Sequence, residues 1–358
     1  MQCLSDRGDP TLFTDENGKT DILSLTLPEL EAQILEMNEK KFRASQIYKW
    51  LHQRRVTDFD SMTDISAQLR DRLKEKFCIK SLFVVKRLES KRDNTVKYLY
   101  RLSDGNHIES VLMEYEHGNT VCVSTQVGCK MGCRFCASTI AGYKRDLLPS
   151  EILAQVYTAE RESGRKIGGV VLMGIGEPLD NFDNVVRFLE LLSCKDGMNM
   201  SLRHVSVSTC GLVPKIYELA KLDLAITLSI SLHASDNKSR SEIMPVNDRY
   251  DINELLKACR DYFKATGRRI SFEYALIDGH NDSREDAERL AKLLGNFVCH
   301  VNIIPVNKIK ERDYRSDRRS AQRFRGYLEE LGINATVRRT LGADIDAACG
   351  QLRREYEI

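Results

Sequence analysis

From about residue 150 to residue 305 the chain alternates between short apolar runs and longer amphipathic segments. The apolar runs predict β-strands, and the segments with apolar residues at helical spacing predict helices. Near-continuous apolar strands separated by such helices favour a parallel sheet covered by helices. The pattern gives about six strand–helix units, too few for an eight-stranded barrel, so we predict an open partial barrel. Strands are predicted at 169–174, 204–208, 225–231, 270–275, 300–305 and 335–338, and helices at 150–163 (with Ser150 as N-cap), from 183, and at 213–221, 252–265, 284–294 and 320–331.

Three cysteines stand at C-x3-C-x2-C spacing just after the strand-like run 121–124: Cys129, Cys133 and Cys136. Such close spacing on a loop lets three thiolates converge on one metal centre, and soft sulfur ligands suit zinc or an iron–sulfur cluster. A structural zinc or a closed cluster normally takes four protein ligands, so three suggest a [4Fe–4S] cluster with one iron open to a small molecule. A zinc with a remote fourth ligand, or three buried structural thiols, are the alternatives at this point.

The composition, with 42% hydrophobic and 30% charged residues over 358 positions, is that of a folded protein with a substantial core. The length fits one large catalytic domain and one small accessory domain. No apolar run approaches the roughly 18 residues of a membrane helix, and the first residues lack the apolar core of a signal peptide, so we expect a cytoplasmic protein. Eleven cysteines fit metal or catalytic use in a reducing compartment. The net charge of +2 neither requires nor excludes a nucleic-acid partner.

The first third of the chain has a different pattern. Residues 1–20 are polar and unpatterned, and residues 25–81 place apolar side chains at helical spacing. A run of charges on such helices is most often a solvated face, but it also suits RNA docking. The predicted helices lie near 27–37, 44–54 and 66–77, and strands are predicted at 82–85, 96–100 and 108–113, with a hairpin turn at 103–106. The basic positions that we expect to be exposed are Lys40, Lys41, Arg43, Lys49, Arg54 and Arg55.

Four segments carry a resemblance to a known family: 122–129 (Cys-Val-Ser-Thr-Gln-Val-Gly-Cys), 173–179 (Met-Gly-Ile-Gly-Glu-Pro-Leu), 231–233 (Ser-Leu-His) and 344–352 (Asp-Ile-Asp-Ala-Ala-Cys-Gly-Gln-Leu). The cysteine loop resembles that of the radical S-adenosylmethionine (SAM) superfamily. With the other segments, nearly the whole chain resembles the adenosine methyltransferases that act on 23S ribosomal RNA and, for some members, on transfer RNA.

The resemblance implies an α/β fold, namely a partial (β/α)6-type radical SAM barrel with a small helical N-terminal domain and a β-hairpin lead-in. It also implies a [4Fe–4S] cluster held by Cys129, Cys133 and Cys136, and SAM as the second cofactor, with two SAM molecules used per turnover. On this basis we expect a flexible leader at 1–20, a helical RNA-docking domain at 21–81, a β-hairpin linker region at 82–117, the catalytic domain at 118–352 and a C-terminal tail at 353–358.

Polar residues follow several predicted strands, and the carboxyl ends of parallel strands form the active-site edge of such a sheet. Read alone, Gly176 and Glu177 belong to an ordinary turn, lone serines and asparagines are more often caps, and a lone histidine is more often a satisfied core residue. The resemblance implies that Gly176 and Glu177 hold the aminoacyl part of SAM. It implies further SAM contacts from Ser208, Ser231, Leu232, His233 and Asn307.

Two further cysteines, Cys122 and Cys349, read singly as structural thiols, but the resemblance implies that both are catalytic. Carbon 2 or 8 of adenine is too poor a nucleophile to attack the SAM methyl group directly. In the family, one SAM methylates Cys349, and a second yields a 5′-deoxyadenosyl radical that takes a hydrogen from this methyl group. The resulting carbon radical adds to the adenine. Attack by Cys122 then leaves a Cys122–Cys349 disulfide. Glu109 matches the position of the proton acceptor, although read alone it is an exposed strand carboxylate.

A group of basic residues follows Asn307, and we expect it near the mouth of the site. Each can simply solubilise the surface, but as a group they suit RNA phosphates and a salt-dependent affinity. The target adenine has to leave its stack, which RNA loops allow. The expected partners are 23S rRNA, transfer RNA and a reductant such as flavodoxin or ferredoxin, with no membrane. The basic residues are Lys308, Lys310, Arg312, Arg315, Arg318 and Arg319.

The function that we expect is methylation of C2 of an adenosine in 23S rRNA, in the peptidyl transferase centre, and in transfer RNA, through an S-methylcysteine carrier and a covalent RNA adduct. A C8-methylating relative that confers antibiotic resistance shares the five key cysteines, and Pro178 favours the C2 type because the resistance type has alanine there. A non-enzymatic RNA-binding protein with a zinc site gives no role to Cys349. A radical SAM enzyme acting on a peptide does not need the helical N-terminal part.

Overall fold

Strands and helices alternate along most of the chain, as the hydrophobic pattern predicts. The computed structural model describes residues 13–15, 17–295, 297–307, 309, 311 and 313–353. Its α-helices are α1 (Leu27–Glu36), α2 (Phe42–His52), α3 (Ala67–Lys76), α4 (Pro149–Ser163), α5 (Phe182–Ser193), α6 (Val213–Ala220), α7 (Asn237–Ile243), α8 (Ile252–Thr266), α9 (Arg284–Leu294) and α10 (Arg318–Glu330). Its strands are β1 (Thr20–Asp21), β2 (Phe77–Cys78), β3 (Phe83–Glu89), β4 (Val96–Arg101), β5 (His107–Tyr115), β6 (Gly118–Cys122), β7 (Gln126–Val127), β8 (Arg145–Asp146), β9 (Ile167–Leu172), β10 (Val205–Thr209), β11 (Thr227–Ser231), β12 (Ile270–Leu276), β13 (Cys299–Pro305) and β14 (Ala335–Val337).

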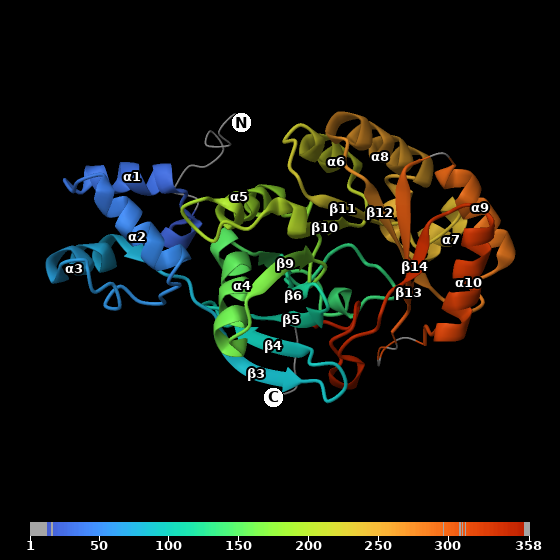
Figure 1. Cartoon of the computed structure of the whole chain (residues 1–358), viewed down its shortest axis with the longest axis horizontal. Helices are drawn as coiled ribbons and strands as arrows, with labels where there is room; N and C mark the ends of the chain where they lie inside the picture. Colours follow the sequence, from blue (N-terminus) through green and yellow to red (C-terminus); the bar gives the residue numbers. More distant parts are fainter. Residues whose placement is uncertain are drawn as a thin grey trace.

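A ten-stranded sheet forms the centre of the molecule, in the order β14-β13-β12-β11-β10-β9-β6-β5-β4-β3 (Figure 1). From β6 to β14 all neighbouring strands are parallel. In this half, β6, β9, β10, β11, β12 and β13 are each followed along the chain by at least one α-helix. It is therefore the predicted open barrel of six strand–helix units, and β14 forms its edge strand. The predicted fold class is confirmed.

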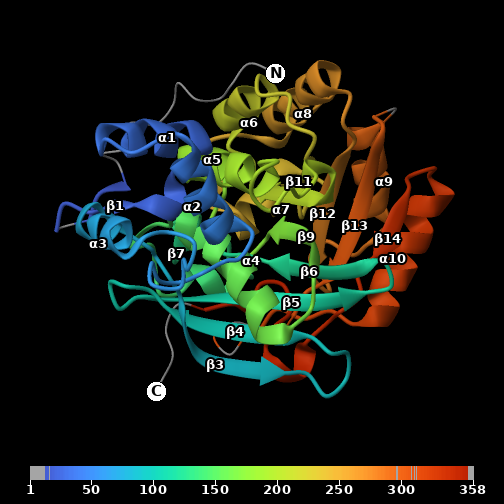
Figure 2. The same ribbon diagram turned by 60° about the vertical axis from the view of Figure 1, so that its left-hand side comes forward.

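The other half of the sheet is an antiparallel meander, β3-β4-β5-β6, that continues the barrel sheet without a break (Figure 2). The predicted hairpin turn joins β4 to β5, where Leu102 N donates to Asn106 O over 2.8 Å. The lead-in strands therefore belong to the same sheet as the barrel, which makes them one wall of the interior.

One predicted helix cap is wrong, and one helix was missed. Ser150 is not an N-cap: α4 starts at Pro149, whose ring already holds φ in the helical range, and the cap position falls on Leu148. Glu151 Oε2 accepts from Leu148 N over 2.9 Å and so supplies the cap from inside the helix. Helix α7 was not predicted, because its seven mostly polar residues, Asn-Lys-Ser-Arg-Ser-Glu-Ile, are too few to show a period.

Helices α1–α3 pack at one end of the sheet and share one continuous hydrophobic core with it (Figure 1). Arg187 on α5 donates to the carboxylate of Glu29 on α1 through its two terminal guanidinium nitrogens, at 2.7 and 3.0 Å. His52 Nδ1 and the Tyr157 hydroxyl are 3.0 Å apart, which ties α2 to α4. No helix among the described residues is both long and apolar enough to span a bilayer.

Four of the six basic positions predicted to be exposed on these helices are exposed: Lys40, Lys41, Lys49 and Arg54. The other two are half-buried and were predicted wrongly. Arg55 turns toward α4 and pairs with Glu160 at 3.0 Å, and Arg43 donates to Gln46 at 2.8 Å.

Candidate functional site

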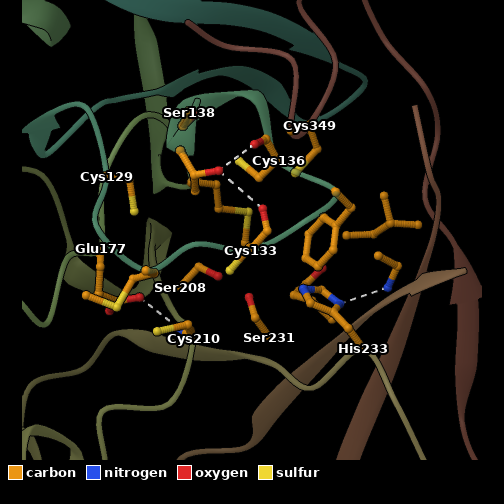
Figure 3. Close-up of a pocket in the computed structure, with 18 of the residues that line it drawn as sticks. Cys129, Cys133, Cys136, Ser138, Glu177, Ser208, Cys210, Ser231, His233 and Cys349 are labelled. Atoms are coloured by element: carbon orange, nitrogen blue, oxygen red, sulfur yellow. Dashed lines mark hydrogen bonds between the residues drawn. The ribbon is translucent and has the colours of Figure 1, made fainter. Parts of the chain in front are cut away.

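A cavity of about 140 Å³ opens at the carboxyl ends of strands β9 to β13, inside the curve of the sheet. The cysteine loop closes one side of it, and strand-end residues form the other (Figure 3). Of the residues predicted to bind the cluster or SAM, all but Leu232 line this cavity. The location agrees with the rule that active sites of parallel α/β sheets lie at this edge.

Cys129, Cys133 and Cys136 lie together on the wall opposite the strand ends (Figure 3). The short antiparallel pair β7–β8 joins the two ends of their loop. The loop is tightly wound at Gly128, which has φ +79°, and a Cβ there would lie 1.7 Å from Gly142 O. Only glycine fits such a position.

The surroundings of the three thiols fit an iron–sulfur cluster. Burial raises the pKa of Cys129 to about 12 and that of Cys133 well above its usual range, so both need bound metal to be held as thiolates. Met131 and Phe135 give the wall an apolar character.

Glu177 and Gly176 lie at the turn after β9. Glu177 is buried, and its carboxylate accepts from Leu179 N at 3.0 Å and from Cys210 N at 2.8 Å. Burial raises its pKa, and these hydrogen bonds oppose the rise. Gly176 has φ +111°, and a Cβ there would meet Gln126 at 2.7 Å. Each carboxylate oxygen keeps a further lone pair, so Glu177 can still accept from a ligand ammonium at the cavity.

His233 follows β11 and has the left-handed φ of 59°. Its Nδ1 accepts from Ala275 N at 2.8 Å, so the neutral ring carries its proton on Nε2. Burial lowers the pKa of His233 to about 3, which keeps the ring neutral. The ring meets Phe135 of the cysteine loop edge-on, with centroids 4.9 Å apart, so it also supports the loop.

Ser208 and Ser231 line the same side of the cavity as His233 (Figure 3). Asn307 contacts the segment that carries Cys349: its Nδ2 donates to Cys349 O at 3.1 Å. Leu232 is fully buried in the main core and does not line the cavity. Only its backbone is near the site, because its side chain points away from those of its neighbours in the chain.

A second cavity, of about 40 Å³, adjoins the first. Cys122 lines it from β6, and Cys349 lies in the wall that the two cavities share. The two thiols come from positions more than 200 residues apart, and both are free in this structure. Burial raises the pKa of Cys122 to about 12. The positive charge of Arg338 acts in the opposite direction on both thiols.

Glu109 is fully buried on β5 and is not the exposed strand carboxylate that the pattern alone indicates. Lys97 Nζ lies 2.6 Å from its Oε1, and Arg353 N donates to its Oε2 at 2.7 Å. Burial raises the pKa of Glu109 to about 7, although both neighbouring cations oppose the rise. A carboxyl group with this pKa can exchange a proton near neutral pH.

The expected basic loop is only partly within the described residues: Lys308, Lys310 and Arg312 lie outside them. Arg315, Arg318 and Arg319 are exposed, the last two at the start of α10.

Three charged residues at the site were not predicted from sequence. Arg240 on α7 is fully buried and donates to the carbonyl oxygens of Cys210, Leu232 and Ser231 at 2.7, 3.1 and 3.2 Å, so it joins the ends of β10 and β11. Glu273 and Arg338 line the main cavity and lie 3.9 Å apart. A carboxylate inside the mostly apolar strand 270–275 was a usable signal for Glu273.

Comparison with known proteins identifies the family. Residues 20–79 match the family model described as "Ribosomal RNA large subunit methyltransferase N-terminal domain", and residues 123–294 match that of the "Radical SAM superfamily". A protein of Lachnoclostridium phytofermentans named "Probable dual-specificity RNA methyltransferase RlmN" is 52% identical over 339 residues, which are 94% of this chain and 95% of that protein. The chain belongs to the RlmN family.

A further RlmN relative of the same name, from Clostridioides difficile, is 50% identical over 343 residues, which are 96% of this chain and 100% of that protein. The crystal structure of a radical SAM methyltransferase from Sphaerobacter thermophilus matches with a TM-score of 0.90 and 44% identity, over 94% of this chain and 99% of that one. Membership of the RlmN family makes the chain a radical SAM methyltransferase, and so implies a [4Fe–4S] cluster and SAM. It rules out the alternative of a non-enzymatic zinc protein.

Proposed function

We propose that this enzyme is a dual-specificity RNA methyltransferase that places a methyl group on C2 of an adenosine in 23S rRNA and in transfer RNA. The observation that carries the proposal is the position of Cys122 and Cys349 at one small cavity beside the cluster cavity. A carbon methyltransferase that uses a protein-bound methyl carrier needs one thiol to carry the group and a second to release it.

In this proposal Cys129, Cys133 and Cys136 hold the cluster, which when bound supplies the electron that cleaves SAM. Gly176, Glu177, Ser208, Ser231, His233 and Asn307 bind and orient SAM at the strand ends, and Leu232 contributes only backbone. Water is excluded by Met131, Phe135 and the aliphatic strand-end residues of the cavity wall. This matters because a carbon radical must meet only its target.

Cys349 Sγ accepts the methyl group of the first SAM and gives up its thiol proton. Burial raises the pKa of Cys349, and the charge of Arg338 opposes this rise and so favours the thiolate that the displacement needs. After the carbon is joined to the adenine, the adduct has one unpaired electron, and the bound cluster would take that electron back. Glu109 accepts the C2 proton. The Cys122 thiolate then attacks Cys349 Sγ, so a disulfide forms and the sulfur–carbon bond breaks; its electron pair stays with the carbon, which takes up a proton and becomes the methyl group. An external reductant, such as flavodoxin or ferredoxin, restores the two thiols.

The choice of C2 over C8 rests on the RlmN names of the relatives and on Pro178 in the turn after β9. The RNA-docking role of α1–α3 is supported by the match of residues 20–79 to the N-terminal domain of ribosomal RNA methyltransferases and by the exposed cations of these helices.

The decisive experiment uses the Cys122→Ala variant with an RNA substrate, SAM and a reductant under anaerobic conditions. We expect a covalent protein–RNA species to accumulate, because the thiol that releases Cys349 is missing. The Cys349→Ala variant should form neither the adduct nor methylated RNA. Mass spectrometry of nucleosides from the wild-type reaction should show 2-methyladenosine. Detection of 8-methyladenosine, or normal methylation by Cys122→Ala without an adduct, would overturn the assignment.

A further inference from the structure

The turn between β3 and β4 binds the chain just before Cys349. Ser90 Oγ donates to Asp344 Oδ1 at 2.8 Å. The other carboxylate oxygen of Asp344 accepts from Lys91 N at 3.1 Å. The bond from Ser90 lowers the pKa of Asp344, so this side chain is a carboxylate at neutral pH and both bonds have a charged acceptor. One exposed side chain thus joins two parts of the chain that lie 254 positions apart.

A second bond joins the same two segments, with the turn as the acceptor. Gly342 N donates to Asp93 Oδ2 at 2.9 Å. Gly342 has φ +64°, and a Cβ there would lie 2.9 Å from Thr95 Cγ2, so the turn and the segment are in close contact. Gly342 O also accepts from Ala347 N at 2.9 Å, which folds residues 342–347 into a compact bend.

The β3–β4 turn is itself firmly held. Ser90 N donates to Thr95 O at 2.8 Å, and Ser90 Oγ accepts from Arg92 N at 3.0 Å. Ser90 and Thr95 are both buried. Arg165, just after α4, donates to Asn94 O at 3.0 Å. The turn is therefore fixed to the rest of the molecule and gives Asp344 a firm attachment point.

Beyond this attachment the chain leads to the two cavities. Cys349 is exposed and lies in the wall that the cavities share. In the proposed function, on which this inference rests, Cys349 Sγ takes a methyl group at the main cavity and later meets Cys122 at the second one. The shorter the free part of a loop, the higher is the effective concentration of a group on that loop at its partner.

We propose that Asp344 is a positioning residue: held by the β3–β4 turn, it fixes the start of residues 342–352, which we call the Cys349 loop, and so raises the effective concentration of Cys349 Sγ at Cys122. The antiparallel lead-in then contributes to the reaction through a turn, residues 90–95, that lines neither cavity.

A role in positioning differs measurably from a role in stability alone. Loss of the bonds at Asp344 leaves both thiols in place but frees more of the chain before Cys349. The disulfide between Cys122 and Cys349 should then form less readily. An attachment that only stabilised the fold would lower the melting temperature and leave the equilibrium between the two thiols unchanged.

The redox equilibrium of Cys122 and Cys349 tests the attachment. The holoenzyme, without RNA or SAM, is equilibrated anaerobically with reduced and oxidised glutathione. The two thiols lose two electrons and two protons to oxidised glutathione, which becomes two reduced molecules, and mass spectrometry measures the fraction of linked peptide. Asp344→Ala should lower the equilibrium constant for disulfide formation roughly tenfold, which raises the reduction potential of the pair by about 30 mV.

Three further variants separate the bonds from the charge. Ser90→Ala keeps the carboxylate and removes one bond, so it should lower the constant in the same direction, and it provides a second route if Asp344→Ala fails to fold. Asp344→Asn should keep part of the wild-type value, because the amide oxygen can still accept one bond. Ser90→Ala/Asp344→Ala should lose no more than Asp344→Ala alone, because both changes remove one shared interaction.

Asp58→Ala is the matched control. Asp58 is also an exposed aspartate that accepts from a serine hydroxyl and a backbone amide, both of Ser61 and both at 2.8 Å. It lies between α2 and α3, outside the sheet. This variant should have the wild-type equilibrium constant, and thermal unfolding checks that every variant folds.

A wild-type constant in Asp344→Ala, an equal loss in Asp58→Ala, or additive losses in the double variant would overturn the positioning role. A wild-type enzyme that forms no Cys122–Cys349 disulfide at any glutathione ratio would overturn it as well. The measurement needs no methyl transfer. If nucleoside analysis showed 8-methyladenosine, the C2 assignment would fail while the redox result would stand.

Discussion

Burial and ion pairing act in opposite directions on the carboxylate of Glu109. Desolvation raises its pKa, and Lys97 and Arg353 lower it, with a result of about 7. An ordinary glutamate would be too weak a base to remove a carbon-bound proton efficiently, and a fully desolvated one would stay protonated. Cys122 and Cys349 show a similar balance, because burial raises the pKa of each thiol while the charge of Arg338 opposes the rise.

The pH dependence of turnover should therefore report Glu109. Because the carboxylate form is the base, the rate of 2-methyladenosine formation in single turnover should fall about tenfold per pH unit below about 7 and level off above it. The enzyme should be pre-methylated on Cys349, so that this step is isolated. Glu109→Gln should be slow and show no such limb. A wild-type rate that stays constant as the pH falls through about 7 would exclude Glu109 as the base.

At the scale of elements, the cysteine loop is held by the strand pair β7–β8, by hydrogen bonds of the Gln126 side chain and by the tight turn at Gly128. The pair β7–β8 joins the ends of the loop, and Gln126 on β7 donates to both Asp146 and Asp180, at 2.8 and 2.7 Å. Helix α7 acts on the opposite wall, where the buried guanidinium of Arg240 binds the carbonyl ends of β10 and β11. Hydrogen bonds thus hold the walls of the cavity in place on both sides.

Gly128 and Gly142 form a matched test of this loop. Both have positive φ, +79° and +68°, but a Cβ at Gly128 would lie 1.7 Å from Gly142 O, whereas nothing lies within 4 Å of one at Gly142. Gly142→Ala should cost only the left-handed backbone strain, about 1–2 kcal/mol. Gly128→Ala adds overpacking of roughly 1–3 kcal/mol or more and should displace the cysteines.

Iron and sulfide content after anaerobic reconstitution, with denaturant unfolding of both variants, checks this prediction. Gly128→Ala should lose most of its iron, and Gly142→Ala should keep it. Equal iron content in the two variants would show that the turn at Gly128 does not shape the cluster site.

At the scale of the whole molecule, helices α1–α3 pack directly against the barrel instead of being joined to it by a linker alone. The Glu29–Arg187 pair, the His52–Tyr157 contact and the shared core fix its position relative to the cavity. The exposed cations of α2 and its flanks, Lys40, Lys41, Lys49 and Arg54, are therefore held in a fixed geometry with respect to the reacting centre. Such an arrangement can place one nucleotide of a bound RNA at the cavity.

Replacement of Lys40, Lys49 and Arg54 with glutamine should weaken RNA binding. Each lost phosphate contact should also lower the slope of log affinity against log salt by about 0.7–0.9. Methylation of saturating RNA should be almost unchanged, because the site is distant. The control replaces Lys257 and Lys264 on α8, which are 71% and 77% exposed and far from α1–α3. An equal loss of affinity in both variants would place the RNA elsewhere.

The sequence alone determined the parts of this protein that depend on neighbours in the chain. The spacing of Cys129, Cys133 and Cys136 indicates a shared metal centre, and the period of each strand and helix predicts the barrel. Because parallel strands end at one edge, Glu177, Ser208, Ser231 and His233 could be brought together without coordinates, and the structure places them on one cavity.

Only the tertiary structure decided the environment of each group. Glu109 read as an exposed strand residue, yet it is buried, and its partners are Lys97 on the neighbouring strand and Arg353 far along the chain. Arg55 was likewise predicted to be exposed and is half-buried, and the fully buried Arg240 was not singled out from sequence at all. The physical reason is that burial and charge pairing depend on strand register and on contacts between distant segments, which local periodicity does not contain.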